Sequence, residues 1–180
     1  MPAMVDLPVS RDPLTPLAFL ERSVRVFPDK TALVYGGLRW SYAELAEQVG
    51  RFAGALLRAG VSPGERVAVL APHVPVLLAA LFAVLRAHAV LVAINTRLAP
   101  DEVGYILNHS GARVVLVDPE LASKVSGAPE PLQASPLLVN LEDPVAGVTG
   151  CPLEGPSWDE FVEGAEPVSV SGGVDDEDRI

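Results

Sequence analysis

Residues 66 to 94 read RVAVLAPHVPVLLAALFAVLRAHAVLVAI, two short valine-rich runs on either side of a longer apolar one. The short runs, RVAVLA (66 to 71) and AVLVAI (89 to 94), are typical of strands, and RVAVLA is apolar on both faces, as in a parallel sheet covered by helices. The run between them, about residues 74 to 87, has Pro75 where a proline suits the first helical turn. It is apolar nearly all round, which predicts a helix inside the protein. This strand, helix, strand order predicts a right-handed crossover between parallel strands.

The same pattern continues on the C-terminal side. Pro100 and the two acidic residues after it predict the start of another helix, which Gly111 ends. RVVLVD (113 to 118) is a further buried strand, and PLLVN (136 to 140) could be one more. The expected fold class is therefore α/β, with a mainly parallel sheet layered with helices.

The N-terminal side adds two helices and a hairpin. Apolar residues at helical spacing predict an amphipathic helix over residues 14 to 27. Gly36 and Gly37, between two β-prone runs, predict a tight hairpin. Ser41 and Glu44 have the spacing of a capping box, in which each side chain bonds a free backbone N–H, so the next helix is expected to begin there.

Composition and charge divide the chain into three expected parts: an N-terminal arm (1 to 13), an α/β subdomain (14 to 140) and a loop-rich, acidic C-terminal segment (141 to 180). Hydrophobic residues make up 49% of the chain and the mean hydropathy is +0.33, which argues against disorder, so most of the sequence is expected to fold. The net charge of -10 is uneven, since residues 1 to 140 carry 12 basic and 12 acidic side chains, whereas residues 141 to 180 carry 1 and 11. No basic stripe could neutralise phosphates, so nucleic acid is not an expected partner.

The single cysteine and the N-terminus indicate a cytoplasmic protein. Cys151 can form no internal disulfide, and next to Pro152 it lacks the basic neighbours that activate a thiol. The first residues lack the basic and apolar layout of a secretory signal. The apolar run from Val74 to Leu85 is too short for a bilayer, which needs about 20 residues. No transmembrane segment is therefore expected.

Two stretches resemble the adenylate-forming (AMP-binding) superfamily, and within it the acyl-CoA synthetases, the CoA ligases of fatty or aryl acids. They are FPDKTALVYGGLRWSYAEL (27 to 45) and GVSPGERVAVLAPHVPVLLAALFAVLRAHAVLVAINTRLAPDEVGYILNHSGARVVLVD (60 to 118), with a looser match at SWDEFVEG (157 to 164). SYAEL and LRAHAVLVAIN resemble the first two signature blocks of the family. INTRLAPDE is more similar to CoA ligases of fatty or related acids than to peptide-synthetase adenylation domains. The family commonly has Gly where this chain has His88, and Pro where it has Ala93.

The resemblance implies the N-terminal portion of an ATP-dependent acyl-CoA ligase, namely the first part of the large N-terminal domain. Such enzymes form an acyl adenylate and pyrophosphate from an acid and ATP with Mg²⁺, and CoA then displaces AMP. Their Ser/Thr/Gly-rich phosphate loop ends in Lys, whereas Ser171, Gly172 and Gly173 lack the threonines and the lysine. The acidic segment is expected to lead into that missing loop. We therefore assign no catalytic, cofactor-binding or metal-binding residue, expect ATP, Mg²⁺ and CoA only for the full-length enzyme, and expect this chain alone to be inactive.

Three polar residues, Asn95, Thr96 and Arg97, are the candidate substrate-binding residues. They follow a predicted parallel strand, and open α/β sheets place functional loops at the carboxyl ends of strands. The structural alternative, which we favour, is that Asn95 caps the turn while Arg97 ties a neighbouring loop or carboxylate. Three histidines (His73, His88 and His109) fall at separate element ends, so neither a metal site nor a catalytic base is expected from them.

Two other classes of function remain open from the sequence. The chain could be a stand-alone, non-catalytic α/β module of this family that binds a partner protein, and exposed apolar surface would then mark it. A small nucleotide-binding domain ranks last, because neither common phosphate-loop motif is present. The expected partners are the remainder of the enzyme and a carboxylic acid, and a homodimer is also open.

Overall fold

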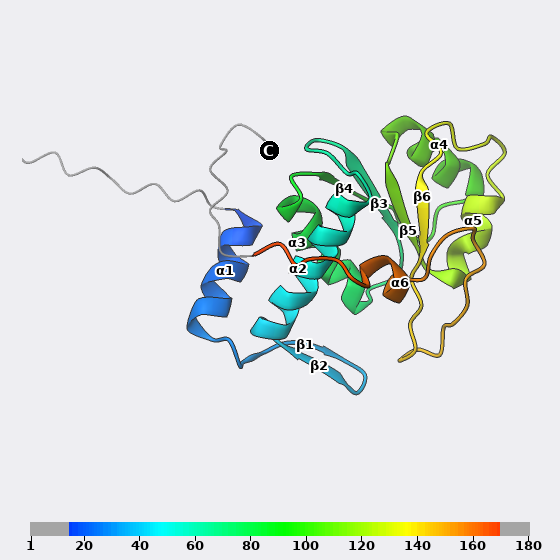
Figure 1. Ribbon diagram of the computed structural model, residues 1–180. Helices are drawn as coiled ribbons and strands as arrows, with labels where there is room; N and C mark the ends of the chain where they lie inside the picture. Colours follow the sequence, from blue (N-terminus) through cyan, green and yellow to red (C-terminus); the bar gives the residue numbers. More distant parts are fainter. Residues whose placement is uncertain (1–14, 170–180) are drawn as a thin grey trace, which may run out of the picture.

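The computed structural model describes residues 15 to 169, and it shows a parallel sheet with helices on both faces (Figure 1). The expected arm (1 to 13) and the Ser171 to Gly173 cluster lie outside the described residues. The helices are α1 (Pro16–Val26), α2 (Tyr42–Arg58), α3 (Pro75–Arg86), α4 (Pro100–Ser110), α5 (Ala122–Ser126) and α6 (Trp158–Val162), with a 3-10 turn η1 (Pro119–Leu121). The strands are β1 (Thr31–Tyr35), β2 (Leu38–Ser41), β3 (Arg66–Leu70), β4 (Val90–Ala93), β5 (Val114–Val117) and β6 (Leu137–Asn140).

The main sheet has the strand order β4-β3-β5-β6, and every neighbouring pair is parallel. The chain passes from β3 to β4 on one side, then crosses back over β3 to reach β5 on the other. Because right-handed crossovers in opposite directions use opposite faces, α3 and α4 lie on different sides of the sheet (Figure 1). The α/β class and the mainly parallel sheet are thus confirmed.

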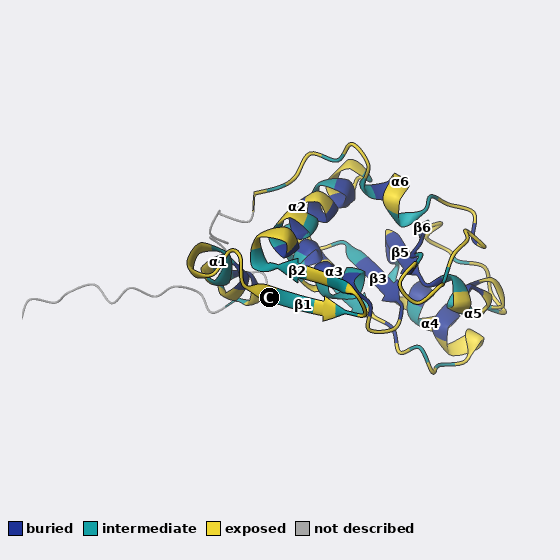
Figure 2. Cartoon of the chain, turned by 90° about the horizontal axis from the view of Figure 1, so that it is seen from below, coloured by how far each residue is buried: buried dark blue, intermediate teal, exposed yellow. Residues whose placement is uncertain are grey.

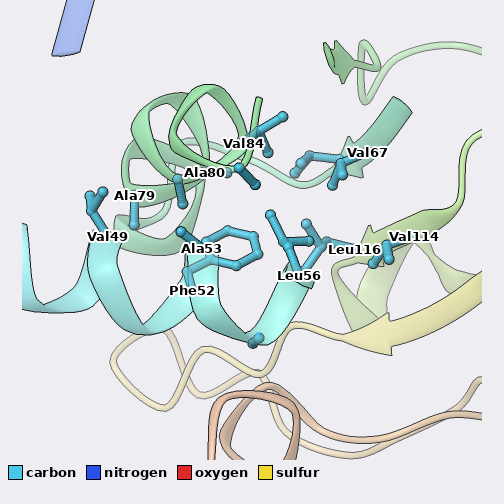
Figure 3. Close-up of a cluster of buried hydrophobic side chains, with 14 of the residues drawn as sticks. Val49, Phe52, Ala53, Leu56, Val67, Ala79, Ala80, Val84, Val114 and Leu116 are labelled. Carbon is cyan, nitrogen blue, oxygen red and sulfur yellow. The ribbon is translucent and has the colours of Figure 1, made fainter. Parts of the chain in front are cut away.

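The core has two layers because successive strand residues face opposite sides of the sheet. On one side, Val67 and Leu116 point toward α2 and α3, where Phe52 and Leu56 are fully buried (Figure 3). On the other side lie Leu70 and its buried partners on α4 and α5. Full burial of each such side chain contributes roughly 1.5 to 3 kcal/mol to stability. The Phe52 ring also meets the Trp158 ring edge to face, with centroids 4.7 Å apart, which attaches α6 to this core.

The local signals at helix α2 and the hairpin are confirmed. The Ser41 backbone N–H donates to the Glu44 carboxylate (2.7 Å) and the Glu44 N–H donates to the Ser41 hydroxyl (3.2 Å), which forms the capping box. Strands β1 and β2 pair antiparallel around Gly36, whose φ of 54° is left-handed and suits glycine.

Helix α3 is less enclosed than its all-round apolar composition predicted. Its inner side is buried against α2 and the sheet, but Leu81 is 43% exposed. The neighbouring strand β4 lies at the edge of the described sheet, and Val90 is 49% exposed. No helix within residues 15 to 169 combines the length and hydropathy that crossing a membrane requires.

The C-terminal part of the described chain crosses α2 as a strap, residues 163 to 169 (orange to red in Figure 1). The Val168 N–H donates to the Gly50 carbonyl (3.0 Å), and the Glu166 carbonyl oxygen occupies the space that a Cβ would need at Gly54. The Arg58 guanidinium donates to the Glu163 carbonyl at 2.6 Å. Two glycines one turn apart on α2 therefore let the backbone of the strap approach closely.

Candidate functional site

The carboxyl edge of the parallel sheet is the candidate functional site. Strands β3 and β5 are neighbours whose following connections leave toward opposite faces, which makes their carboxyl ends a topological switch point. Open α/β sheets place ligands in the crevice at such points. The polar residues that follow β4, β5 and β6 therefore decide what this edge can do.

Asp118 follows β5 directly and is only 2% exposed. Its Oδ1 accepts from the Glu120 backbone N–H (2.9 Å) and so begins η1, while its own N–H donates to the Leu70 carbonyl (3.0 Å). Burial raises the pKa of the Asp118 carboxyl, and the nearby charges of Glu120 and Asp143 act in the same direction, against the lowering effect of the Glu120 N–H. The carboxylate thus shapes the turn at an electrostatic cost.

Asp143 joins this edge to the hairpin. Its Oδ2 accepts from the Tyr35 hydroxyl (2.5 Å), and its Oδ1 accepts from the backbone N–H groups of Val145 (3.1 Å) and Ala146 (3.2 Å). The hydrogen bond to Asp143 raises the pKa of Tyr35, as do burial and the charges of Asp143 and Asp118. Tyr35 is therefore held as a neutral donor that fastens the turn after residue 143 to β1.

Asn140, the last residue of β6, is completely buried. Its Nδ2 donates to the carbonyls of Leu153 (3.2 Å), Gly155 (3.2 Å) and Pro156 (3.3 Å), and its Oδ1 accepts from the Leu153 N–H (3.2 Å). One amide side chain thus satisfies four buried or partly buried backbone contacts, as buried polar groups require. It binds the loop before α6 to the sheet.

The three candidate residues after β4 form a turn with structural contacts. Asn95 Oδ1 accepts from the Arg97 N–H (2.9 Å), the side-chain cap that the sequence predicted. The Arg97 side chain is exposed and makes no ion pair or hydrogen bond with the described residues, contrary to the tie expected of it. Lys124 of α5 makes that tie instead, since its Nζ donates to the carbonyls of Thr96 and Leu98, both at 2.7 Å.

Within residues 15 to 169, the histidines and the cysteine belong to no group of three or more possible metal ligands. His73 is exposed before α3, and His88 follows α3 in the left-handed conformation expected there, with φ 54°. His109 stacks on Tyr105, with ring centroids 5.6 Å apart. Desolvation and the charges of Glu142 and Glu160 raise the pKa of the exposed Cys151 thiol, which disfavours the reactive thiolate.

The buried polar side chains of the edge bind loops. Asp118, Asn140 and Asp143 accept or donate within the protein, and residues 15 to 169 contain no cluster of three or more His, Cys, Asp or Glu side chains that could hold a metal ion. We derive no catalytic step through the described residues. The sequence missed the roles of Tyr35 and Lys124, because their partners are distant along the chain. The partner of Tyr35 is 108 residues away, and those of Lys124 are 28 and 26 residues away.

Comparison with known proteins identifies the family. The model of the AMP-binding enzyme family matches residues 20 to 163. The 4-hydroxybutyrate–CoA ligase 2 of Metallosphaera sedula is 40% identical over 131 residues, which cover 73% of this chain and 24% of that protein. Feruloyl-CoA synthase of an Amycolatopsis species is 45% identical over 105 residues, covering 58% and 21%.

The structural comparison agrees. A benzoate CoA ligase from Burkholderia xenovorans LB400 superposes with a TM-score of 0.73 at 31% identity, and the match covers 89% of this chain and 31% of that one. The chain thus spans about a quarter of the curated relatives it matches. Its fold is that of the first part of an acyl-CoA ligase N-terminal domain. The chain belongs to the AMP-binding enzyme family.

Proposed function

We propose that this chain is the first part of an ATP-dependent acid–CoA ligase that converts a carboxylic acid, ATP and CoA into acyl-CoA, AMP and pyrophosphate through an acyl adenylate. The observation that carries the proposal is the match to CoA ligases, at 40% identity over 73% of the chain for the 4-hydroxybutyrate enzyme. ATP, Mg²⁺ and CoA would be bound mainly by the remainder of the enzyme.

The role proposed for these residues is support. The bonds of Asn140, Asp143 and Lys124 fasten three loops to the carboxyl edge of the sheet, and a preorganised edge is what an active site built beside it requires. The acid is proposed to be a fatty or related acid, from the likeness of INTRLAPDE (94 to 102) to such ligases. A cytoplasmic location, and pairing with the rest of the enzyme, belong to the same proposal.

The proposal is tested with two proteins, the product of the complete reading frame and the purified 180-residue chain. Each is given ATP, Mg²⁺, CoA and a panel of aliphatic and aromatic acids, and AMP release and pyrophosphate exchange are measured. The complete product is expected to release AMP with at least one acid, and the 180-residue chain with none. Exchange catalysed by the 180-residue chain alone, or a folded complete product inactive with every acid, would overturn the proposal.

The same experiment separates the stand-alone interaction module from the ligase. If the complete reading frame encodes no more than these residues, and the chain forms a stable complex with another protein, the module is favoured. The observation that favours an interaction module is the exposure of aliphatic side chains such as Leu81 and Val90.

A further inference from the structure

Helix α1 presents an apolar stripe to solvent as well as one to the core. Leu17 and Leu20 are 2% and 3% exposed and pack inward, and Glu21 also turns inward, with its carboxylate 3.6 Å from the Arg86 guanidinium. On the outward side, Phe19 is 55% exposed and Val26 is 52% exposed. Figure 2 shows α1 at one end of the molecule with its outer side exposed.

The turn after α1 extends this stripe. Phe27, at the C-terminal cap of the helix, is 53% exposed, and the Lys30 ammonium lies over its ring, 5.3 Å from the centroid. Two phenylalanines and a valine are therefore more than half exposed within nine residues.

The charges around the stripe are mostly positive. Arg22, Arg25 and Lys30 are exposed, whereas Asp29 is the exposed acid between residues 16 and 30. The chain as a whole carries a net charge of -10, so this local excess of cations opposes the general trend. A surface that combines long cationic side chains with exposed aromatic rings suits the boundary between lipid headgroups and acyl chains.

We propose that the outer face of α1 and the turn to Lys30 bind an anionic membrane surface peripherally. Phe19, Val26 and Phe27 enter the boundary region, while Arg22, Arg25 and Lys30 contact acidic headgroups. Helix α1 lies at one end of the described part of the fold, with exposed positions along it (Figure 2). An interface with protein would instead be expected to exclude charge from its apolar centre.

The test is sedimentation of the purified chain with vesicles of phosphatidylcholine and phosphatidylserine, against vesicles of phosphatidylcholine alone. Binding is expected to the anionic vesicles and to fall with added salt. Each cation near the surface contributes about fivefold to the partition coefficient, so Arg22→Gln/Arg25→Gln is expected to lower it roughly 25-fold. Phe19→Ser is expected to lower it by about tenfold.

Two variants are matched controls, since their side chains are also exposed but lie elsewhere. Tyr105→Ser removes an aromatic ring that is 68% exposed on α4, and Arg97→Gln/Arg113→Gln removes two exposed charges next to the main sheet. Both controls are expected to bind like the wild type, and circular dichroism checks that all variants are folded. Equal losses in the controls and the α1 variants, equal binding to neutral vesicles, or no binding by the wild type would overturn the proposal. So would loss of a solution dimer in Phe19→Ser without any vesicle binding.

Discussion

Asn140 should be the most sensitive polar residue of the carboxyl edge. Asn140→Ala removes the hydrogen bonds to Leu153, Gly155 and Pro156. The Pro156 carbonyl keeps its bond from the Asn140 backbone N–H (2.9 Å), and the exposed Gly155 can be hydrated. The N–H and carbonyl of the buried Leu153 are left without partners, at about 1 to 3 kcal/mol each.

We therefore expect Asn140→Ala to lower the free energy of unfolding by about 2 to 4 kcal/mol, a large part of the 5 to 15 kcal/mol typical of a domain. Urea denaturation followed by circular dichroism measures this value. Hydrogen exchange should show faster exchange across residues 150 to 157, which the Asn140 amide attaches to β6. Asn108→Ala is the matched control, because its bonds to Pro131 and Gln133 are exposed, and it should cost less than about 1 kcal/mol.

An isosteric change sharpens the test. Asn140→Asp keeps the shape but points a buried carboxylate at carbonyl oxygens, which raises the pKa of the new carboxyl in the folded state. Its protonated form can donate one bond, so the loss of stability should be smallest near pH 4 and grow as the pH rises toward 7. A loss below 1 kcal/mol for Asn140→Ala, or Asn140→Asp as stable as the wild type at pH 7, would refute the assignment.

Three further changes test other parts of the fold. Gly54→Ala should displace the strap, because the new Cβ meets the Glu166 carbonyl. Hydrogen exchange of residues 163 to 169 should therefore become faster, even though α2 gains up to about 1 kcal/mol of helix propensity. Gly37→Ala, with open space around the new Cβ, is the control. His88→Gly should stabilise the protein by roughly 0.5 to 1 kcal/mol in urea denaturation, since φ is 54° there, and no gain would contradict the strain. The pKa of Tyr35 is raised in the folded state, so the free energy of unfolding should fall as the pH rises above about 10, where the phenol of the unfolded chain ionises first. Denaturation at pH 9 and pH 11 should show a smaller fall in this free energy for Tyr35→Phe than for the wild type.

The sheet was predictable from the sequence, but the order of its strands was not. Buried valine runs such as RVAVL and VVLV report burial on both faces, and the helices between them impose parallel pairing. Whether β5 joins beside β3 or beside β4 depends on the direction of the second crossover, which no local pattern encodes. For the same reason the sequence did not reveal that β4 lies at an edge and leaves Val90 half exposed.

The candidate site was predictable only where its contacts are local. The Asn95 cap spans two residues and follows from the preference of asparagine for such turns, whereas the Lys124 clamp on Thr96 spans 28 and depends on where α5 packs. The same limit hid the strap, because the signal for it is the lack of side chains at Gly50 and Gly54 on a helix whose other positions fit an ordinary buried stripe. Close backbone contacts leave little trace in an amphipathic pattern.

The polar residues at the carboxyl edge indicate why a support of this kind can be separate from the chemistry it serves. A carboxylate that already accepts two backbone N–H groups and a phenol, as Asp143 does, has little capacity left to act as a base or bind a cation. Such a group positions a loop, because its fixed hydrogen bonds keep the loop within a narrow range of geometries. Asn140 and Asp143 bond inward through both of their polar side-chain atoms, and Asp118 Oδ1 holds the turn into η1, which is the arrangement expected of a scaffold.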